Sequence, residues 1–103
     1  MVKIMILLKR QEHLSFKEFE NWWLGQHQEM AAQMPRLKRA RFNLVQGAED
    51  LLYDGVSELW FDSISDFEFA YQSEIGKKVA ADSLAHVGKR DRLIVEEHTI
   101  FGD

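Results

Sequence analysis

The order of hydrophobic patterns along this chain of 103 residues constrains its fold more than any other feature of the sequence. Alternating or branched apolar residues predict strands, and apolar residues repeated every three to four positions predict helices. The predicted segments in chain order are a strand at 2–9, a helix at 15–34, strands at 37–46 and 56–62, a helix at 65–86 and a strand at 91–101. This order is typical of the ferredoxin-like (βαββαβ) α+β fold. We therefore expect a four-stranded antiparallel sheet with both helices on one face and the other face open.

The first strand and the first helix carry the clearest local signals. Segment 2–9 is rich in branched apolar residues, which favours a strand buried on both faces. Ser15 followed by Glu18 is a capping-box pattern, in which a hydroxyl and a carboxylate bind free amide groups at a helix start. Pro35 disfavours helical geometry in the residue before it, so the helix is expected to end at about Met34.

Glycines and serines divide the middle of the chain. Along 37–46, the alternation places Phe42 on the apolar side of a half-exposed strand, and a loop at 47–55 follows. Ser65 and Glu68 form a second capping-box pattern at the start of the second helix. Gly76 is expected to interrupt that helix, which then continues to residue 86.

Composition and charge exclude several classes of function. The chain has 46% hydrophobic residues, 29% charged residues and a net charge of −4, which suits one globular domain spanning residues 1–103. Its basic residues occur in short clusters, so neither nucleic acid nor a membrane surface is an expected partner. The apolar run Ile4–Leu8 is too short for a signal peptide or a membrane span. The absence of cysteine excludes disulfides and thiolate metal sites, and these features together fit the cytoplasm.

His27 is the most distinctive residue of the first helix. At about 100° per residue, it falls within roughly 40° of Trp23 around the helix axis. The same stripe also carries Phe16, Phe19, Met30 and Met34. Two interpretations are open: a core histidine that bonds a backbone or strand group, or a working residue at the wall of a pocket. Apolar surroundings favour the neutral imidazole, which is able to accept a proton.

Two stretches of the sequence resemble the EthD-like family. The pattern FKEFENWWLGQH…MPRL is similar to the family's first helix, which carries an aromatic pair, a histidine four residues on and a later proline. GVSELWFDSISDFE, followed by AAD, is similar to its third strand and second helix. The resemblance implies that two ferredoxin-like protomers pair through their open sheet faces into a dimeric α/β barrel. It also implies a pocket in each protomer between the sheet and the helices.

The resemblance also implies a set of site residues. His27 is expected to act as the general acid/base of the pocket. The residues expected to contact a substrate are Phe19, Trp23, Met30, Tyr53, Trp60, Tyr71 and His86. Asp82, in AAD, is expected to cap or brace a helix rather than react. The sequence has no phosphate loop, nucleophile elbow or metal-ligand spacing, so no cofactor or metal is expected.

The function expected from these features is that of a small cytoplasmic, homodimeric, cofactor-free enzyme. Members of the dimeric α/β-barrel superfamily, to which the EthD-like family belongs, include isomerases, cyclases, dehydratases and monooxygenases. The predicted substrate is an apolar or aromatic carbonyl compound of a catabolic or secondary-metabolic pathway. Whether the reaction is of oxidoreductase or isomerase/lyase type is open. Two alternatives are a non-catalytic module that holds a small ligand or a protein partner, and a haem-binding protein. The loop at 47–55 lacks the histidine of methylmuconolactone isomerase-like members, which speaks against that isomerase activity.

Overall fold

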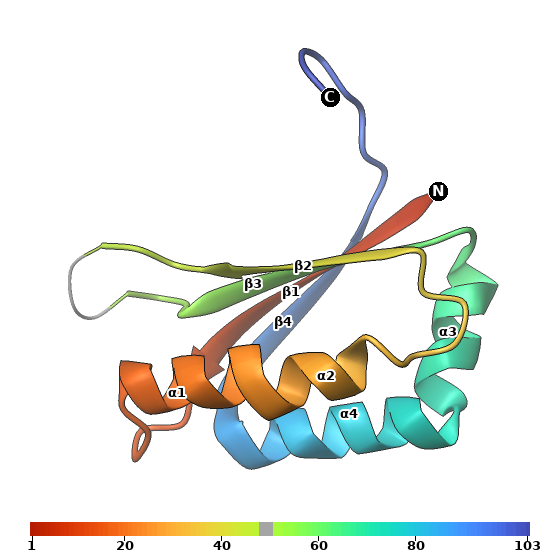
Figure 1. Cartoon of the computed structure of the whole chain (residues 1–103). Helices are drawn as coiled ribbons and strands as arrows, with labels where there is room; N and C mark the ends of the chain where they lie inside the picture. Colours follow the sequence, from red (N-terminus) through yellow and green to blue (C-terminus); the bar gives the residue numbers. More distant parts are fainter. Residues whose placement is uncertain (48–50) are drawn as a thin grey trace.

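The protein, in a computed structural model that describes residues 1–47 and 51–103, contains a layer of strands and a layer of helices (Figure 1). The strands are β1 (Val2–Arg10), β2 (Arg39–Leu44), β3 (Gly55–Phe61) and β4 (Val87–Val95). The helical segments are α1 (Phe16–Trp22), η1 (Trp23–His27), α2 (Gln28–Ala31), α3 (Ile64–Gln72) and α4 (Glu74–His86). Residues 48–50 of the predicted loop at 47–55 lie outside the described residues.

The strands form one sheet of four in the order β2-β3-β1-β4, and every neighbouring pair is antiparallel. This arrangement confirms the predicted ferredoxin-like fold. Figure 1 shows α1, α2 and α4 on the same side of the sheet. In the part of the chain that the structure describes, no helix covers the opposite face, which we call the open face.

The alternation along β1 decides which side chains enter the core. Ile4, Ile6 and Leu8 belong to the core cluster beneath the helices and are at most 8% exposed. Met5 and Leu7, on the open face, are only half-buried. The prediction of a strand buried on both faces is therefore wrong for the single protomer, because the helices cover one face.

The first helix begins where the sequence predicts. The Ser15 hydroxyl accepts a hydrogen bond from the Glu18 amide at 3.1 Å, and the Glu18 carboxylate accepts one from the Ser15 amide at 2.8 Å. Both partners of the capping box are thus in place. The helical segment ends at Ala31 rather than at Met34, and a turn leads from there into Pro35.

A π-helical turn, η1, interrupts this helix in the middle. The Gln28 amide donates to the carbonyls of Gly25, three residues earlier, and Trp23, five residues earlier, instead of to that of Leu24, four residues earlier. Gly25 takes the non-helical conformation at this kink, with φ −101° and ψ −107°. The sequence pattern predicted an uninterrupted helix here, because a constant rotation per residue cannot represent one extra residue in a turn.

Two serines, rather than the predicted signals, set the boundaries of α3 and α4. Ser63 is the N-cap of α3 and accepts from the Asp66 amide at 3.1 Å, so the predicted cap at Ser65 is wrong. Ser73 ends α3 and caps α4, accepting from the Gly76 amide at 3.1 Å. The interruption predicted at Gly76 therefore lies at Ser73. No helix in residues 1–47 or 51–103 is long and apolar enough to cross a membrane.

The last strand occupies different residues from those predicted. β4 begins at Val87, directly after α4, and ends at Val95, whereas the pattern predicted a strand at 91–101. No loop separates the helix from the strand, so no turn signal marked the boundary. The residues after Val95 leave the sheet, and in Figure 1 the C-terminal segment projects away from the helices.

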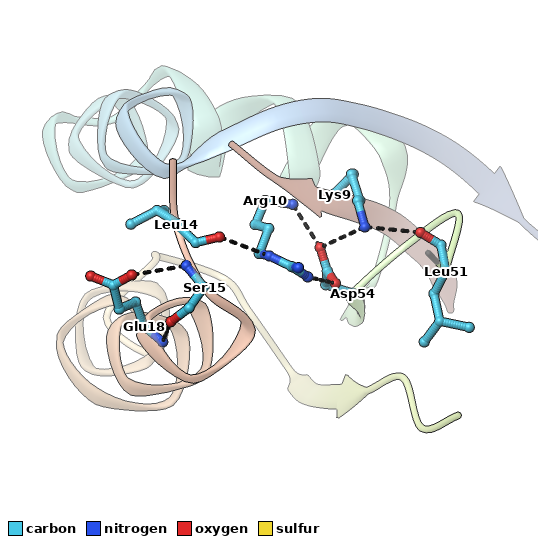
Figure 2. A network of polar contacts seen from close by, with 7 residues as sticks. All are labelled: Lys9, Arg10, Leu14, Ser15, Glu18, Leu51 and Asp54. Atoms are coloured by element: carbon cyan, nitrogen blue, oxygen red, sulfur yellow. Dashed lines mark hydrogen bonds and ion pairs between the residues drawn. The ribbon is translucent and has the colours of Figure 1, made fainter. Parts of the chain in front are cut away.

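A buried aspartate, Asp54, ties the end of β1 to the segment before β3 (Figure 2). Its side chain, 2% exposed, forms an ion pair with the Arg10 guanidinium and accepts from the Arg10 amide at 2.8 Å. Lys9 Nζ lies 3.6 Å from the same carboxylate and donates to the Leu51 carbonyl at 2.9 Å. Arg10 Nε donates to the Leu14 carbonyl at 2.8 Å, beside the capped start of α1. This network fixes one end of the sheet against the helix layer.

Candidate functional site

A small cavity lies between the sheet and the helices. Its volume is about 30 Å³, and most of its wall is made of core side chains from β1, β3 and the helices. Polar side chains also line it, namely His27, Ser57, Tyr71, Ser83 and Arg90. A cavity needs about 10–15 Å³ to hold one water molecule, so this inner cavity has room for a small chemical group rather than a whole metabolite.

A wider recess adjoins the inner cavity on the side of β4. We call it the outer recess; its volume is about 400 Å³, and it is lined by Ile6, Tyr71, Ala80, Arg90 and Arg92. All of these except Arg92 also line the inner cavity, so the two spaces share a boundary. Small-molecule sites have volumes of about 300–1,000 Å³, and the outer recess falls in that range.

His27 is held at the cavity wall by Asp82 of α4. The His27 Nδ1 and Asp82 Oδ2 atoms are 2.8 Å apart, and the two side chains are 7% and 14% exposed. A carboxylate only accepts hydrogen bonds, so Nδ1 carries the proton in the neutral imidazole and Nε2 is left with a lone pair. Among the residues that the structure describes, Nε2 has no hydrogen-bond partner, and His27 lines the inner cavity.

Burial sets the charge of His27. The pKa of His27 is lowered from its ordinary value of 6.5, chiefly because burial penalises the imidazolium. The bond and charge of Asp82 act in the opposite direction, and the nearby His86 adds to the lowering. At neutral pH the imidazole is therefore uncharged, which is the form that accepts a proton.

Trp22 and His86 support Asp82 from behind. Trp22 Nε1 donates to Asp82 Oδ2 at 3.0 Å, so one carboxylate oxygen holds two rings. His86 stacks on Trp22 with ring centres 4.2 Å apart, and its Nδ1 lies 2.8 Å from the Asp82 backbone carbonyl. Within residues 1–47 and 51–103, no three histidine, aspartate or glutamate side chains are arranged to hold a metal ion.

The π-helical turn brings Trp23 to the cavity as well. Trp23 is fully buried and stacks on Phe42 of β2, with ring centres 4.5 Å apart and planes 8° from parallel. A methyl group placed on Gly55 would lie 2.6 Å from two carbon atoms of the Trp23 ring, so glycine permits this close approach. Trp23 Nε1 is buried, with no hydrogen-bond partner among the described residues.

Tyr71 of α3 connects the inner cavity with the outer recess. It lines both spaces, and burial raises the pKa of its hydroxyl while Arg90 and Arg92 act to lower it. The hydroxyl thus stays protonated at neutral pH and is able to donate a hydrogen bond. A methyl group on Gly76 would lie 2.6 Å from the Tyr71 Cα atom, so this glycine lets α4 pack closely behind α3.

Three of the residues predicted as site residues line the cavity, and the others lie elsewhere. Trp23, His27 and Tyr71 are brought together around it. Phe19 is fully buried in the core beside Trp22 and Trp23, Met30 packs half-buried against the same core, and His86 sits behind Asp82.

Tyr53 and Trp60 lie farther from the cavity. Tyr53 donates to Asp91 at 2.6 Å, and Trp60 donates to Glu97 at 3.1 Å. Trp60 pairs with Lys3 on the open face, across the sheet from the cavity. Neither residue lines the inner cavity or the outer recess, and their roles in substrate contact stay predictions.

Sequence reasoning missed three residues of the site. Asp82 was expected to cap or brace a helix rather than react; it does join α4 to the first helix through Trp22 and His27, but its contact with His27 was not foreseen. Arg90 and Arg92 escaped notice because the strand was expected to begin at Asp91, which left Arg90 outside it. The alternation of two arginines along one strand face was the signal that could have revealed them.

Comparison with known families places the chain in a sequence family. The model of the EthD domain family matches residues 11–87, which is well over half of the chain. No curated protein sequence matches the chain.

Solved structures share the fold over nearly the whole chain. An EthD family protein from Bacillus halodurans is 21% identical, with a TM-score of 0.83, covering 95% of this chain and 99% of that chain. A dimeric ferredoxin-like protein of unknown function from Thermobifida fusca is 15% identical, with a TM-score of 0.75, covering 91% and 88%. SnoaB, a cofactor-independent oxygenase from Streptomyces nogalater, is 14% identical, with a TM-score of 0.71, covering 99% and 97%.

At such low identities these structures establish the fold alone, whereas the family match rests on sequence. That match includes the first helix with His27 and the segment of α4 with Asp82. The chain therefore belongs to the EthD domain family.

Proposed function

We propose that the protein is a small cofactor-independent enzyme in which His27 moves a proton of an apolar or aromatic carbonyl compound. One observation carries the proposal: Asp82 holds His27 Nδ1 at 2.8 Å, which leaves Nε2 available at the wall of a cavity. Membership of the EthD family supports it, since the family shares its fold with a cofactor-independent oxygenase.

The chemistry begins with removal of a proton from the carbon next to the carbonyl. Nε2 of neutral His27 takes this proton, and the C–H electron pair moves onto the carbonyl oxygen to give an enolate. Asp82 stabilises the imidazolium that forms, because its carboxylate bonds Nδ1. The Tyr71 hydroxyl donates to the enolate oxygen, where negative charge develops.

The enolate leads to any of the predicted reactions. Return of the proton to another carbon isomerises the compound, loss of a hydroxyl group as water dehydrates it, and attack on a second carbonyl cyclises it. Reaction of the enolate with dioxygen oxidises it. Since all four share the first step, a test of proton removal does not require the natural substrate.

Hydrogen–deuterium exchange tests this first step directly. The protein is incubated in D₂O with a panel of enolisable aryl ketones and aryl keto acids, and exchange at the carbon next to the carbonyl is followed by NMR. Replacing His27 by alanine is expected to lower the catalysed exchange rate about 10²- to 10⁴-fold. The His98→Ala variant is the control, because His98 is 71% exposed and bonds Glu96 outside the sheet.

Circular dichroism must show that the His27→Ala variant keeps its fold. Undiminished exchange by a folded His27→Ala variant would contradict the role of His27 as general acid/base. A ligand that binds and is recovered unchanged, without exchange, would instead favour a non-catalytic binding module. The apolar wall of the inner cavity suits such a module as well.

The proposal includes a homodimer formed through the open faces of two sheets. The centre of that face carries the apolar pairs Met5–Leu93 and Leu7–Val56, flanked by Glu58 and Asp91 in the strand register. Leu93 is 52% exposed in the single chain, so a second copy would bury apolar surface there. The dimeric state of the Thermobifida fusca protein supports this assembly.

Light scattering at micromolar concentration tests the dimer. We expect a dimer of the wild-type chain and a monomer of the Leu93→Glu variant, because a charge would be buried at the centre of the interface. Leu84→Glu is the matched control, since Leu84 is 63% exposed on α4, away from the open face. A wild-type chain that is only monomeric would contradict the barrel.

A further inference from the structure

Arg90 and Arg92 stand side by side on the helix-facing side of the sheet. In the antiparallel register Arg90 pairs with Leu8 and Arg92 with Ile6, and both of these partners point into the core. Both arginines are exposed although they face the helix layer. Both line the outer recess, and Arg90 also lines the inner cavity.

Neither guanidinium is neutralised within the part of the chain that the structure describes. No carboxylate of residues 1–47 or 51–103 lies within 4.0 Å of Arg90 or Arg92. Arg92 lies over the ring of Phe67, 5.1 Å from its centre, which positions the side chain and leaves its N–H groups free. Arg36, by contrast, holds Asp66 at 3.0 Å.

The outer recess therefore offers hydrogen-bond donors. Its polar side chains are the two arginines and Tyr71, whose hydroxyl is protonated at neutral pH because burial raises its pKa. Its remaining lining residues, Ile6 and Ala80, have apolar side chains. A site of guanidinium and phenol donors on an apolar floor fits an aryl or alkyl group that ends in a carboxylate, because the planar guanidinium matches a carboxylate with two parallel bonds.

We propose that the outer recess is an anion site, in which Arg90 and Arg92 bind a carboxylate of the substrate. The part of this inference that concerns the reaction rests on the proposed function, whereas binding of an anion does not. It narrows the substrate class from carbonyl compounds in general to carbonyl compounds that carry a carboxylate. With the carboxylate in the outer recess, the reacting carbon reaches past Tyr71 into the inner cavity, where His27 stands.

Binding of benzoate and of its neutral analogue benzamide tests the anion site without any turnover. Isothermal titration calorimetry, or ligand-observed NMR, is expected to show saturable benzoate binding in the millimolar range and at least tenfold weaker binding of benzamide. Replacing Arg90 and Arg92 together by glutamine is expected to weaken benzoate binding about tenfold to a hundredfold, because charge-assisted hydrogen bonds are lost. Benzamide binding is expected to stay the same in this double variant.

Two controls locate the effect. The double variant Lys17→Gln and Lys78→Gln removes the same charge from exposed positions of α1 and α4 that line neither space, and is expected to keep benzoate binding. The His27→Ala variant is also expected to keep it, so a failure of the catalytic assignment leaves the anion site standing.

Three outcomes would overturn the anion site. The first is the absence of saturable benzoate binding to the wild-type chain. The second is equal affinity of the wild-type chain and of the Arg90 and Arg92 double variant, with circular dichroism showing that both are folded. The third is an equal loss in the Lys17 and Lys78 control, which would indicate an effect of net charge alone.

Discussion

Two aspartates, Asp54 and Asp82, have the same side chain but different kinds of hydrogen-bond partner. Asp54 is buried against two cations and a backbone amide, so its charge is neutralised by side chains that also bond backbone carbonyls. Asp82 instead holds two neutral rings, Trp22 and His27, through one oxygen atom. The network of Asp54 is closed, whereas that of Asp82 ends at His27, which lines a cavity and whose Nε2 has no hydrogen-bond partner among the described residues.

The difference indicates how a structural carboxylate can be distinguished from a positioning one. A closed network of charges and fixed donors stabilises the fold and has no group left for a ligand. A network that ends in an unpartnered titratable atom keeps a reactive group in one orientation. Loss of Asp54 should therefore cost stability, and loss of the Asp82 charge should cost activity.

The largest effect is expected from Asp54→Ala. Removing this carboxylate leaves the Arg10 amide and guanidinium without their partner near the end of β1, so the free energy of unfolding should fall by about 3 kcal/mol. Urea denaturation measures the loss. The control is Asp62→Ala, which breaks a surface pair with Lys38 and should cost less than about 1 kcal/mol. Equal losses in the two variants would remove the structural role of Asp54.

Asp82→Asn should separate activity from stability. The amide oxygen still accepts from Trp22 and His27, so the unfolding free energy should change little, but the charge that stabilises the imidazolium is lost. We expect exchange to slow about tenfold to a hundredfold. The pKa of His27 should fall further, because Asp82 at present raises it, and the acid limb of the rate profile should move to lower pH. An unmoved limb would contradict this role of Asp82.

Trp22→Phe should have a smaller effect on the same network. The variant loses the indole N–H bond to Asp82 and keeps an aromatic ring against His86. Thermal or urea unfolding should show a loss of about 1 kcal/mol, with exchange slowed only a few-fold. A loss of activity as large as that of Asp82→Asn would mean that Trp22, rather than the charge, orients the histidine.

The last expected effect is a dependence of stability on pH. The pKa of folded His27 lies below 6.5, so between that pKa and 6.5 the unfolded chain binds a proton that the folded chain does not. Stability contributed by His27 is therefore complete above pH 6.5 and is lost as the pH falls through this window, by at most about 1.4 kcal/mol per pH unit. Urea unfolding of wild type and His27→Gln at several pH values isolates the contribution, and parallel pH curves would contradict it.

Elements and faces could be predicted from the sequence because they follow from local periodicity. The branched apolar run at 2–9 and the capping box at Ser15 are such local signals, and both mark elements that the structure contains, although the run did not reveal that the helices cover only one face of β1. The predicted boundaries of α3 and α4 were wrong, because two residues in the same segment could each have capped or ended a helix. Ser63 caps α3 although Ser65 matched the motif, and Ser73 separates α3 from α4 although Gly76 was the more obvious breaker.

The candidate site was predictable only in part, because its decisive contacts join distant segments. His27 was placed on the buried side of its helix by periodicity, which required no partner. The bond to Asp82 joins residues 55 positions apart and depends on how α4 packs against the first helix. Arg90 and Arg92 share the outer recess with Tyr71 of α3 and Ala80 of α4, and no local sequence pattern specifies which helix residues lie against a strand.

The π-helical turn at Trp23–His27 holds one residue more than an α-helical turn. Deleting Gly25 would turn the bond from the Gln28 amide to the Trp23 carbonyl into a regular α-helical bond across four residues. The helical segments before and after the turn would then keep their relative orientation, and His27, directly before Gln28, would keep its place beside Asp82. When relatives of this protein are aligned, a gap of one residue in this turn is thus compatible with an unchanged pair of histidine and aspartate.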